Sequence, residues 1–194
     1  MSAFFENERH LARLIREDWQ ANFRDWTLPG FRALAVHRFG SWVQHIRWAP
    51  VRVPLRRVYT VMFRYVRNHY GIELPVTTTV GHRVVIGHQN GIVIHGDAVL
   101  GDDCFIRQNV TVGNNWLSDG APKLGRGVSL GPGAVVVGDI TIGDRARIGP
   151  NAVVMIDVAA DTAVFASTPR TLKLVKSPVP NSQESDSRLV GQDP

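Results

Sequence analysis

The chain has 194 residues, of which 44% are hydrophobic and 20% are charged, a balance typical of a folded, soluble protein rather than a disordered one. A single cysteine excludes an internal disulfide framework, and the sequence has no run of about 18 uncharged apolar residues that could cross a bilayer. Because residues 1–17 are charged throughout and lack the apolar core of a secretory signal, we expect a cytoplasmic protein.

The net charge of +5 is unevenly distributed along the chain. Residues 1–70 contain twelve arginines and five acidic residues, whereas residues 71–194 contain ten basic and twelve acidic residues. The basic first part is either a solvated, arginine-rich helix face or a surface that makes peripheral contact with an acidic membrane. The sequence has no nucleic-acid-binding motif, so we expect no nucleic-acid partner.

Residues 1–70 are predicted to form a small region of three helices. Apolar residues at helical spacing indicate a first helix over 4–24, which the sequence Thr-Leu-Pro-Gly at 27–30 ends. A second helix is expected over 30–47, and Pro50 and Pro54 should separate it from a third at about 55–69. We assign no chemistry to the histidines of this region, which are His10, His37, His45 and His69.

From residue 71 the sequence changes to valine, isoleucine, threonine and glycine, and an aliphatic residue returns at every sixth position. A period of six fits neither a helix nor a simple strand alternation, and it is typical of short parallel strands stacked into a β-helix. We therefore predict a mainly β fold, with a β-helix over residues 71–176 preceded by the small α-helical region. The aliphatic repeat positions are Ile94, Leu100, Ile106, Val112, Leu124, Leu130, Val136, Ile142, Ile148 and Val154.

A second set of small or β-branched residues stands two positions before the repeat positions, and both sets should point into a narrow interior. This second set is Ala98, Cys104, Val110, Val128, Ala134, Ile140, Ala146 and Ala152. Cys104 is thus expected to be a buried, inert thiol. Glycines often follow the repeat positions, where we expect corners with unusual backbone angles; they are Gly101, Gly113, Gly125, Gly131, Gly143 and Gly149.

Two irregularities interrupt the repeat. Between Ile86 and Ile94 the spacing is eight, so extra residues should bulge near His88. Residues 114–122 break the repeat and should form an exposed loop, the kind of place where function concentrates. Residues 177–194 are expected to be a disordered tail.

Four further residues lie near the expected corners. His82 and His95 fit surface or capping roles, although His95 is the better second candidate for chemistry because it is close to the bulge. Arg107 and Gln108 lie beside a corner, from which they could reach an acceptor molecule.

Residues 71–173 resemble the catalytic domain of serine acetyltransferases and related hexapeptide acyltransferases. The segments that carry the resemblance are GHQNGIVIHGDAVLGDD, NVTVG and PKLGRGVSLGPGAVVVGDITIGDRARIGPNAVV. REDWQANFRD and PGFRALAVHRFGSWV also resemble that family's helical region, so the likeness covers about residues 15–175. It implies a left-handed parallel β-helix, a homotrimer or a dimer of trimers, and transfer of acetyl from acetyl-CoA to a hydroxyl, without a metal.

The resemblance also implies a catalytic pair. His88 matches the family's catalytic histidine, and an imidazole with a pKa near 6.5 is suited to take a proton from a hydroxyl. Glu73 falls where the family has an aspartate that orients this histidine. Its carboxylate would fix the histidine tautomer and stabilise the imidazolium that forms during the reaction.

Acetyl-CoA is expected in the groove between neighbouring chains, as in the family. The turn positions that would contact the pantetheine arm are Gly113, Asn114, Pro132 and Pro150. The basic side chains expected near the phosphates are Arg147, Arg170 and Lys173, each of which also fits a solvent-facing charge.

Three positions depart from the serine acetyltransferases. Gly87 stands where they have an aspartate, and Gly120 and Ala121 stand where they have an adjacent arginine and histidine. These changes remove the groups best able to bind an ammonium and a carboxylate. The IGHQNG and FIRQNVTVG segments also resemble acetyltransferases of exopolysaccharide and capsule biosynthesis. The expected acceptor is therefore a sugar hydroxyl of an exopolysaccharide or its precursor.

Two alternatives remain open. The first is a serine O-acetyltransferase of cysteine biosynthesis. The second is a non-catalytic scaffold that keeps the β-helix but has lost the chemistry.

Overall fold

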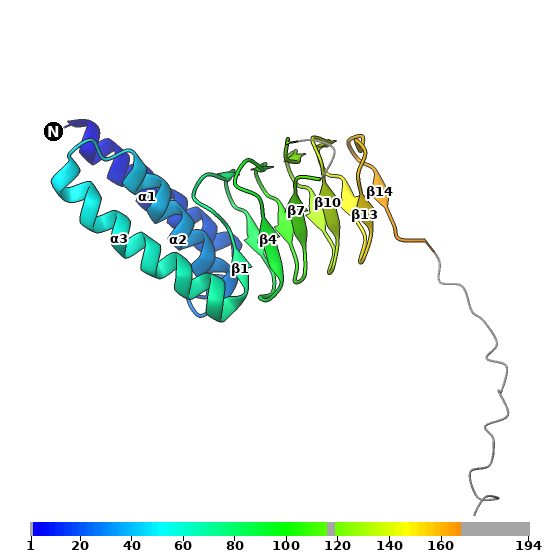
Figure 1. The fold of residues 1–194 in the computed structure, drawn as a ribbon, viewed down its shortest axis with the longest axis horizontal. Helices are drawn as coiled ribbons and strands as arrows, with labels where there is room; N and C mark the ends of the chain where they lie inside the picture. The colour runs from blue at the N-terminus through cyan, green and yellow to red at the C-terminus, as the bar shows by residue number, and fades with distance from the viewer. Residues whose placement is uncertain (1, 116–118, 168–194) are drawn as a thin grey trace, which may run out of the picture.

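A computed structural model describes residues 2–115 and 119–167, and it consists of helices followed by a β-helix (Figure 1). The helices are α1 (Ser2–Ala21), α2 (Pro29–Gln44) and α3 (Ala49–Tyr65), and α3 continues into a π-helical turn, η1 (Val66–Tyr70). No helix among the described residues is long and apolar enough to cross a membrane.

The helix α3 begins six residues earlier than the sequence predicts, so the expectation that Pro50 and Pro54 separate two helices is wrong. Pro50 lies in the first turn, where a backbone N–H would have no intrahelical partner and a proline therefore costs little. Pro54 lies inside the helix and removes one of its hydrogen bonds. The helix nevertheless continues, because Tyr59 and Phe63 pack against the core on one of its sides.

The helix α2 is the centre of the helical region, because it packs against α1, α3 and the first strands. Two glycines allow these close contacts. A Cβ on Gly30 would overlap the backbone of Ile86, and a Cβ on Gly40 would overlap the ring of Tyr59. Most of α2 is consequently buried.

Buried polar contacts attach the helices to the β-helix. Arg38 donates through Nε to Asp18 at 2.8 Å, and its guanidinium also donates to the carbonyls of Val80, at 2.7 Å, and Gly81. Arg38 and Asp18 are 5% and 1% exposed, so the pair is shielded from water. His37 donates through Nε2 to the Thr78 carbonyl at 3.0 Å. The helices and the first coil therefore form one packed unit.

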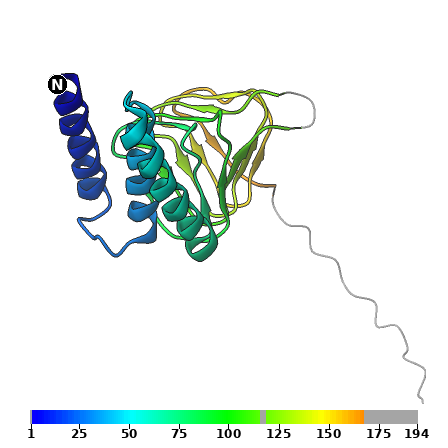
Figure 2. The ribbon, with the colours of Figure 1, turned by 60° about the vertical axis from the view of Figure 1, so that its left-hand side comes forward.

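The β-helix consists of three parallel sheets whose strands alternate along the chain (Figure 2). Sheet A contains β1 (Ile72–Glu73), β4 (Ile92–Ile94), β7 (Thr111–Gly113), β10 (Val135–Val137) and β13 (Val153–Val154). Sheet B contains β2 (Thr79–Val80), β5 (Val99–Leu100), β8 (Lys123–Leu124) and β11 (Thr141–Ile142). Sheet C contains β3 (Val85–Ile86), β6 (Phe105–Ile106), β9 (Ser129–Leu130), β12 (Arg147–Ile148) and β14 (Ala163–Val164).

The strand register accounts for both irregularities in the repeat. Partners are 18 positions apart in a regular coil, as for Val135 and Val153. Ile72 and Ile92 are 20 positions apart, so the first coil contains two extra residues, as the spacing near His88 predicts. Val99 and Lys123 are 24 positions apart, so the predicted loop at 114–122 adds six residues. Residues 116–118 of this loop lie outside the described residues.

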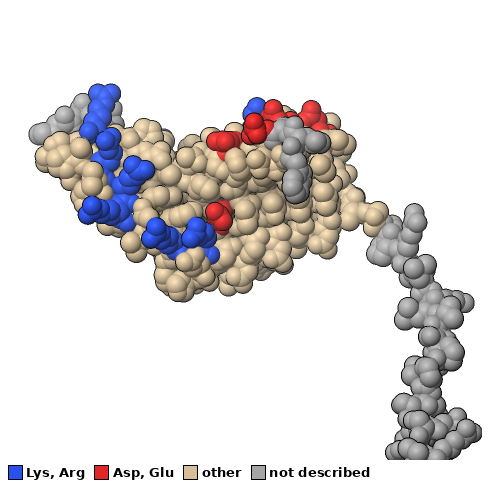
Figure 3. All heavy atoms as spheres, in the orientation of Figure 1, with Lys and Arg blue, Asp and Glu red and all other residues tan. Residues whose placement is uncertain are grey.

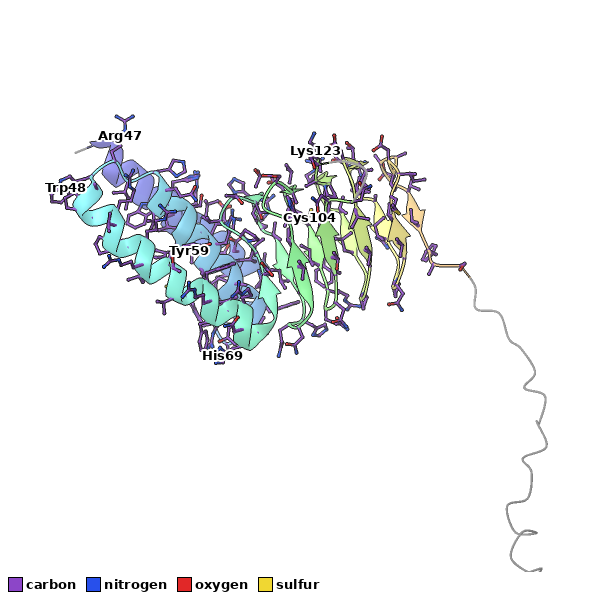
Figure 4. All side chains as sticks on the ribbon, in the orientation of Figure 1. Arg47, Trp48, Tyr59, His69, Cys104 and Lys123 are labelled. Carbon is purple, nitrogen blue, oxygen red and sulfur yellow. The ribbon has the colours of Figure 1, made fainter. Side chains whose placement is uncertain are left out.

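The two sets of residues predicted to fill the interior of the β-helix are buried. Every aliphatic repeat position is at most 3% exposed, and every member of the second set is at most 9% exposed. Cys104 lies inside the prism (Figure 4), where its thiol donates to the Gly125 carbonyl at 3.3 Å. Burial raises the pKa of Cys104 to about 11, consistent with the predicted inert thiol.

The reason given from the sequence for the corner glycines is wrong. None of the six glycines that follow repeat positions has a positive φ; the residues that do include Asn109, Gly127, Gly133 and Arg145. A Cβ on Gly101 would instead lie 2.5 Å from the Gly125 carbonyl oxygen of the next coil. Close approach of successive coils, rather than backbone angle, therefore requires glycine there. Gly113 is an exception, because no atom lies within 4 Å of its hypothetical Cβ.

Candidate active site

One edge of the prism, where sheet C passes into sheet A, carries several of the predicted site residues. Because Ile86 pairs with Ile106, Ile106 with Leu130, and Leu130 with Ile148, the residues two positions later also form a column. We call this column the C–A edge, and it consists of His88, Gln108, Pro132 and Pro150.

His88 lies in the two-residue bulge at the top of the C–A edge and is exposed. The bulge is held against the end of the helical region, because the Asn90 N–H donates to the Tyr70 carbonyl at 2.8 Å. Asn90 and Gly91 both have positive φ, which turns the chain sharply into β4. The extra residues therefore project His88 from a fixed backbone.

Glu73 lies on β1, next to the same end of the C–A edge. It is half-buried and pairs with Val93, so its side chain is on the outer face of sheet A. Among the described residues no hydrogen bond joins the Glu73 carboxylate to the His88 ring. The structure thus brings the two residues to one end of the prism without joining their side chains.

An aromatic residue that the sequence analysis did not single out occupies the space beside His88. A Cβ on Gly87 would lie 2.9 Å from Cζ of Phe105, the residue that follows Cys104 in the next coil. The Arg107 guanidinium carbon lies 5.5 Å from the centre of the Phe105 ring. The Phe105 ring therefore fills the place that a side chain at position 87 would occupy, and Arg107 lies over this ring. The pairing of Val85 with Phe105, 20 positions later, reveals this neighbour only once the strand partners are known.

Gln108 lies directly beyond His88 on the C–A edge. Its Oε1 is buried and has no hydrogen-bond partner in the described chain. An unpaired buried carbonyl oxygen is costly, so this atom is suited to accept a hydrogen bond from a ligand. Arg107 is exposed beside it.

The residues predicted to contact acetyl-CoA fall into two groups. Pro132 and Pro150 lie on the C–A edge, and Arg147 is exposed on the adjoining outer face of sheet C. At about 4.8 Å per coil, Pro150 is about 14 Å from His88 along the prism. Gly113 and Asn114 lie instead where sheet A passes into sheet B, so a single chain does not bring them to this edge. Arg170 and Lys173 lie outside the described residues, as do the last residues of the predicted β-helix and the predicted tail at 177–194.

The end of the 114–122 loop has no room for the side chains that serine acetyltransferases carry there. A Cβ on Gly120 would overlap the side chain of Asp139. Ala121 is only 4% exposed and points into the core. A carboxylate-binding arginine at position 120 would therefore require this end of the loop to move.

The other histidines make structural contacts. His82 donates through Nδ1 to Glu17 of α1 at 2.7 Å, and His95 accepts through Nδ1 from the Asp97 N–H at 3.2 Å. Burial, together with the neighbouring Arg38, lowers the pKa of His37 to about 4, so this ring is neutral. Within the described ranges no cluster of three or more His, Cys, Asp or Glu side chains is placed to hold a metal ion.

Comparisons with known proteins identify relatives of the whole arrangement. The family model described as "Bacterial transferase hexapeptide (six repeats)" matches residues 121–155. A serine acetyltransferase of Synechococcus elongatus is 35% identical over 164 residues, which cover 82% of this chain and 64% of that protein. "Putative colanic acid biosynthesis acetyltransferase WcaB" of Escherichia coli K12 is 34% identical over 169 residues, which cover 82% of this chain and 99% of WcaB.

A solved structure shows the same fold. Serine acetyltransferase isoform 3 of Entamoeba histolytica, in complex with cysteine, superposes with a TM-score of 0.73 at 24% identity. The match covers 90% of this chain and 64% of that chain, so this chain spans about two thirds of the length of that enzyme. The fold is thus the left-handed parallel β-helix with preceding helices that the sequence predicts.

Proposed function

We propose a function from the premise that this chain belongs to the hexapeptide-repeat acetyltransferases, the family that includes serine acetyltransferases and WcaB. In this proposal the chain transfers an acetyl group from acetyl-CoA to a hydroxyl of a saccharide, such as an exopolysaccharide precursor. The reaction takes place at the C–A edge, in the cytoplasm, and uses no metal.

His88 acts as the general base. Its neutral imidazole takes the proton of the acceptor hydroxyl while the oxygen attacks the thioester carbonyl of acetyl-CoA. The tetrahedral intermediate then expels the CoA thiolate, which receives the proton back from the imidazolium, so the products are the acetyl ester and CoA–SH. Glu73 holds the ring tautomer and stabilises the imidazolium, a role that its position next to the same end of the prism supports.

Acetyl-CoA lies along the C–A edge in this proposal. The distance of about 14 Å between His88 and Pro150 suits an extended pantetheine arm, with the thioester at His88 and the phosphates near Arg147. Arg170 and Lys173 supply further positive charge at that end. Gly113 and Asn114 come from a neighbouring chain, because in one chain they lie at a different corner.

The need for residues of a neighbouring chain implies an oligomer, and we propose the homotrimer that is usual in this family. The outer face of sheet A supports it, because Val93, Thr111, Val135 and Val153 form one in-register column on that face. Val93 is 45% and Val153 is 64% exposed in the single chain. We propose that this column, called here the sheet A column, packs against the neighbouring chain.

The acceptor is assigned as a saccharide on one observation, the contact between Gly87 and Phe105. A neutral aromatic ring stands beside the base where serine acetyltransferases carry an acidic group suited to an ammonium. The ring offers an apolar surface to the C–H face of a sugar, and the unpaired Gln108 Oε1 accepts from a sugar hydroxyl. The packed positions Gly120 and Ala121 also lack the arginine and histidine that serine acetyltransferases carry there.

The test is acetyl transfer from acetyl-CoA, followed as CoA release, with a panel of nucleotide sugars, lipid-linked oligosaccharides and L-serine. We expect turnover with a saccharide and a fall of roughly 10²- to 10⁴-fold in H88N, whose thermal unfolding should match that of the wild type. Turnover of L-serine and of no saccharide would establish the serine alternative instead. Equal measurable rates for the wild type and H88N would remove His88 from the role of general base, and no turnover with any acceptor would favour the non-catalytic scaffold.

A further inference from the structure

The helix α3 presents most of its surface to solvent. No residue from Ala49 to Tyr65 is fully buried, and the helix contacts the rest of the protein through half-buried side chains such as Leu55, Tyr59 and Phe63. Figure 4 shows α3 running from Arg47 and Trp48 at its beginning, past Tyr59, to His69 at the end of η1. Because α3 packs against the protein on one side only, the residues on its solvent-facing side indicate whether that side has a binding role.

The solvent-facing side of α3 has an apolar part. Pro54, Val58, Val61 and Tyr65 are spaced by four, three and four residues, so they share one side of the helix. Val58, Val61 and Tyr65 are 48%, 68% and 50% exposed. These four residues form what we call the α3 apolar strip.

A strip of arginines lies beside it. Arg57 and Arg64 are exposed and, at 100° per residue, fall on the adjoining side of the helix, whereas Arg56 lies almost opposite the apolar strip. Figure 3 shows basic side chains gathered along α3, whereas most acidic side chains in that view lie over the β-helix. Arg57 and Arg64 form the α3 arginine strip.

The charge around α3 is uncompensated. Residues 26–72 contain eight arginines and no aspartate or glutamate. Arg38 is paired with Asp18 and Arg32 donates to the Tyr70 hydroxyl at 2.7 Å. The other six are exposed, and within residues 2–115 and 119–167 none of them takes part in a salt bridge; they are Arg47, Arg52, Arg56, Arg57, Arg64 and Arg67.

An apolar cleft continues the α3 apolar strip toward α2. It has a volume of about 510 Å³, and its lining includes Trp26, Phe31, Val61, Met62 and Tyr65. Trp26 is 58% exposed at this site. An exposed tryptophan beside an apolar cleft and arginines is the combination found where proteins enter the interface between lipid headgroups and acyl chains.

We propose that α3 docks the protein on the surface of an anionic lipid bilayer, with the α3 apolar strip among the acyl-chain ends and the α3 arginine strip on the lipid phosphates. A second copy of the chain on this face would place arginine against arginine, which is unfavourable. A nucleic acid would engage the arginines but leave the apolar strip exposed. The inference does not depend on the acceptor or on the acetyl transfer.

The test is co-sedimentation of the full chain with vesicles of phosphatidylcholine alone or mixed equally with phosphatidylglycerol. We expect binding to the mixed vesicles only, weakened by salt. R57E/R64E should lose at least roughly tenfold in affinity, since each basic residue near the surface is worth roughly fivefold. The control R16E/R126E makes the same charge change on exposed residues of α1 and the β-helix, and it should bind like the wild type.

The apolar strip has a separate test. V58D/V61D should also lose binding, whereas I156D, which changes an exposed residue of the last coil, should keep it. Circular dichroism would establish that each variant is folded.

The proposal is wrong if the wild type binds neither vesicle, if it binds both equally, or if both control variants lose binding as much as the α3 variants. It is also wrong if the α3 variants change the mass in solution while vesicle binding is unaffected, or if double-stranded DNA is bound and vesicles are not.

Discussion

Position 87 shows how one backbone position can depend on a side chain eighteen residues away. Gly87 precedes the candidate base, and its missing side chain is matched by the ring of Phe105. A side chain at position 87 and a ring at position 105 compete for one space. The absence of an acidic residue beside His88 is therefore linked to the presence of an aromatic one.

This link predicts a coupling free energy. G87A should destabilise the protein when Phe105 is present, because the new Cβ would lie 2.9 Å from the ring, and should cost less in the F105A background. We expect the double-mutant cycle to give an interaction of about 0.5–3 kcal/mol in the free energy of unfolding. Urea unfolding of the four proteins measures it. Additive effects would mean that the ring moves aside freely.

At the scale of single residues, the sequence predicts where a residue lies along the β-helix, but it does not predict which side chains meet between coils. The spacing of eight between Ile86 and Ile94 was enough to predict the bulge that exposes His88. Phe105 could not be found in the same way, because its contact with Gly87 depends on which residues meet across coils. That pairing follows from the two-residue insertion only once the strand partners are known. The catalytic roles of His88 and Glu73 remain predictions.

At the scale of elements, the hexapeptide period predicts the strands, but it does not by itself explain the glycines between them. The glycines that follow repeat positions face the backbone of the next coil instead of adopting a positive φ. Similarly, prolines at 50 and 54 indicate a break when the sequence is considered alone. The first of them fits the helix start, and packing on α2 maintains the helix past the second.

The two kinds of glycine give a matched pair of variants. G101A should lower the free energy of unfolding by about 1–3 kcal/mol, because its Cβ would lie 2.5 Å from the Gly125 carbonyl oxygen. Gly113 also follows a repeat position, but no atom lies within 4 Å of its hypothetical Cβ. The variant G113A should therefore change the free energy of unfolding by less than about 1 kcal/mol. Denaturation at equal chain concentration measures both. Equal losses would contradict the close-approach explanation.

The contact between α2 and the first coil should make stability depend on pH. His37 has a pKa of about 4 in the folded protein and the usual 6.5 when unfolded, so the unfolded state binds more protons between these values. The stabilising contribution is present above pH 6.5 and is lost as the pH falls toward 4. We expect a loss of about 2 kcal/mol between about pH 7 and pH 5.

The variant H37N isolates this effect. Asparagine can still donate to the Thr78 carbonyl but does not titrate, so its unfolding free energy should fall less over the same pH range. The quantity to compare is the difference in pH dependence between the two proteins, because other groups such as Glu17 titrate in both. Parallel curves would mean that His37 is not the source.

At the scale of the whole molecule, two outer faces of the prism differ in composition. The outward column of sheet B is Thr79, Val99, Lys123 and Thr141, whereas that of sheet A contains three valines, Val93, Val135 and Val153, together with Glu73 and Thr111. A face with exposed valines in register is suited to another protein surface, and a face with lysine and threonine is suited to water. This contrast supports assigning the chain contact to sheet A.

The assembly prediction follows from the sheet A column. The wild type should have three times the 21.5 kDa mass of the chain in light scattering. V93E/V153E should shift the mass toward the single chain, because two buried carboxylates would face an apolar partner. T79E/T141E adds the same charges on sheet B and should remain trimeric. Loss of the trimer in this control variant, rather than in V93E/V153E, would move the interface to sheet B.

The register of the coils has a consequence for how such a protein can diversify. Strand partners are 18 positions apart in regular coils, but they are 20, 24 or 16 apart elsewhere, and the parallel pairing resumes each time. A lineage can therefore lengthen or shorten a corner without redesigning the core beneath it. The length of a corner is thus set separately from the packing of the core, although a corner position such as Gly87 still meets a side chain of the next coil.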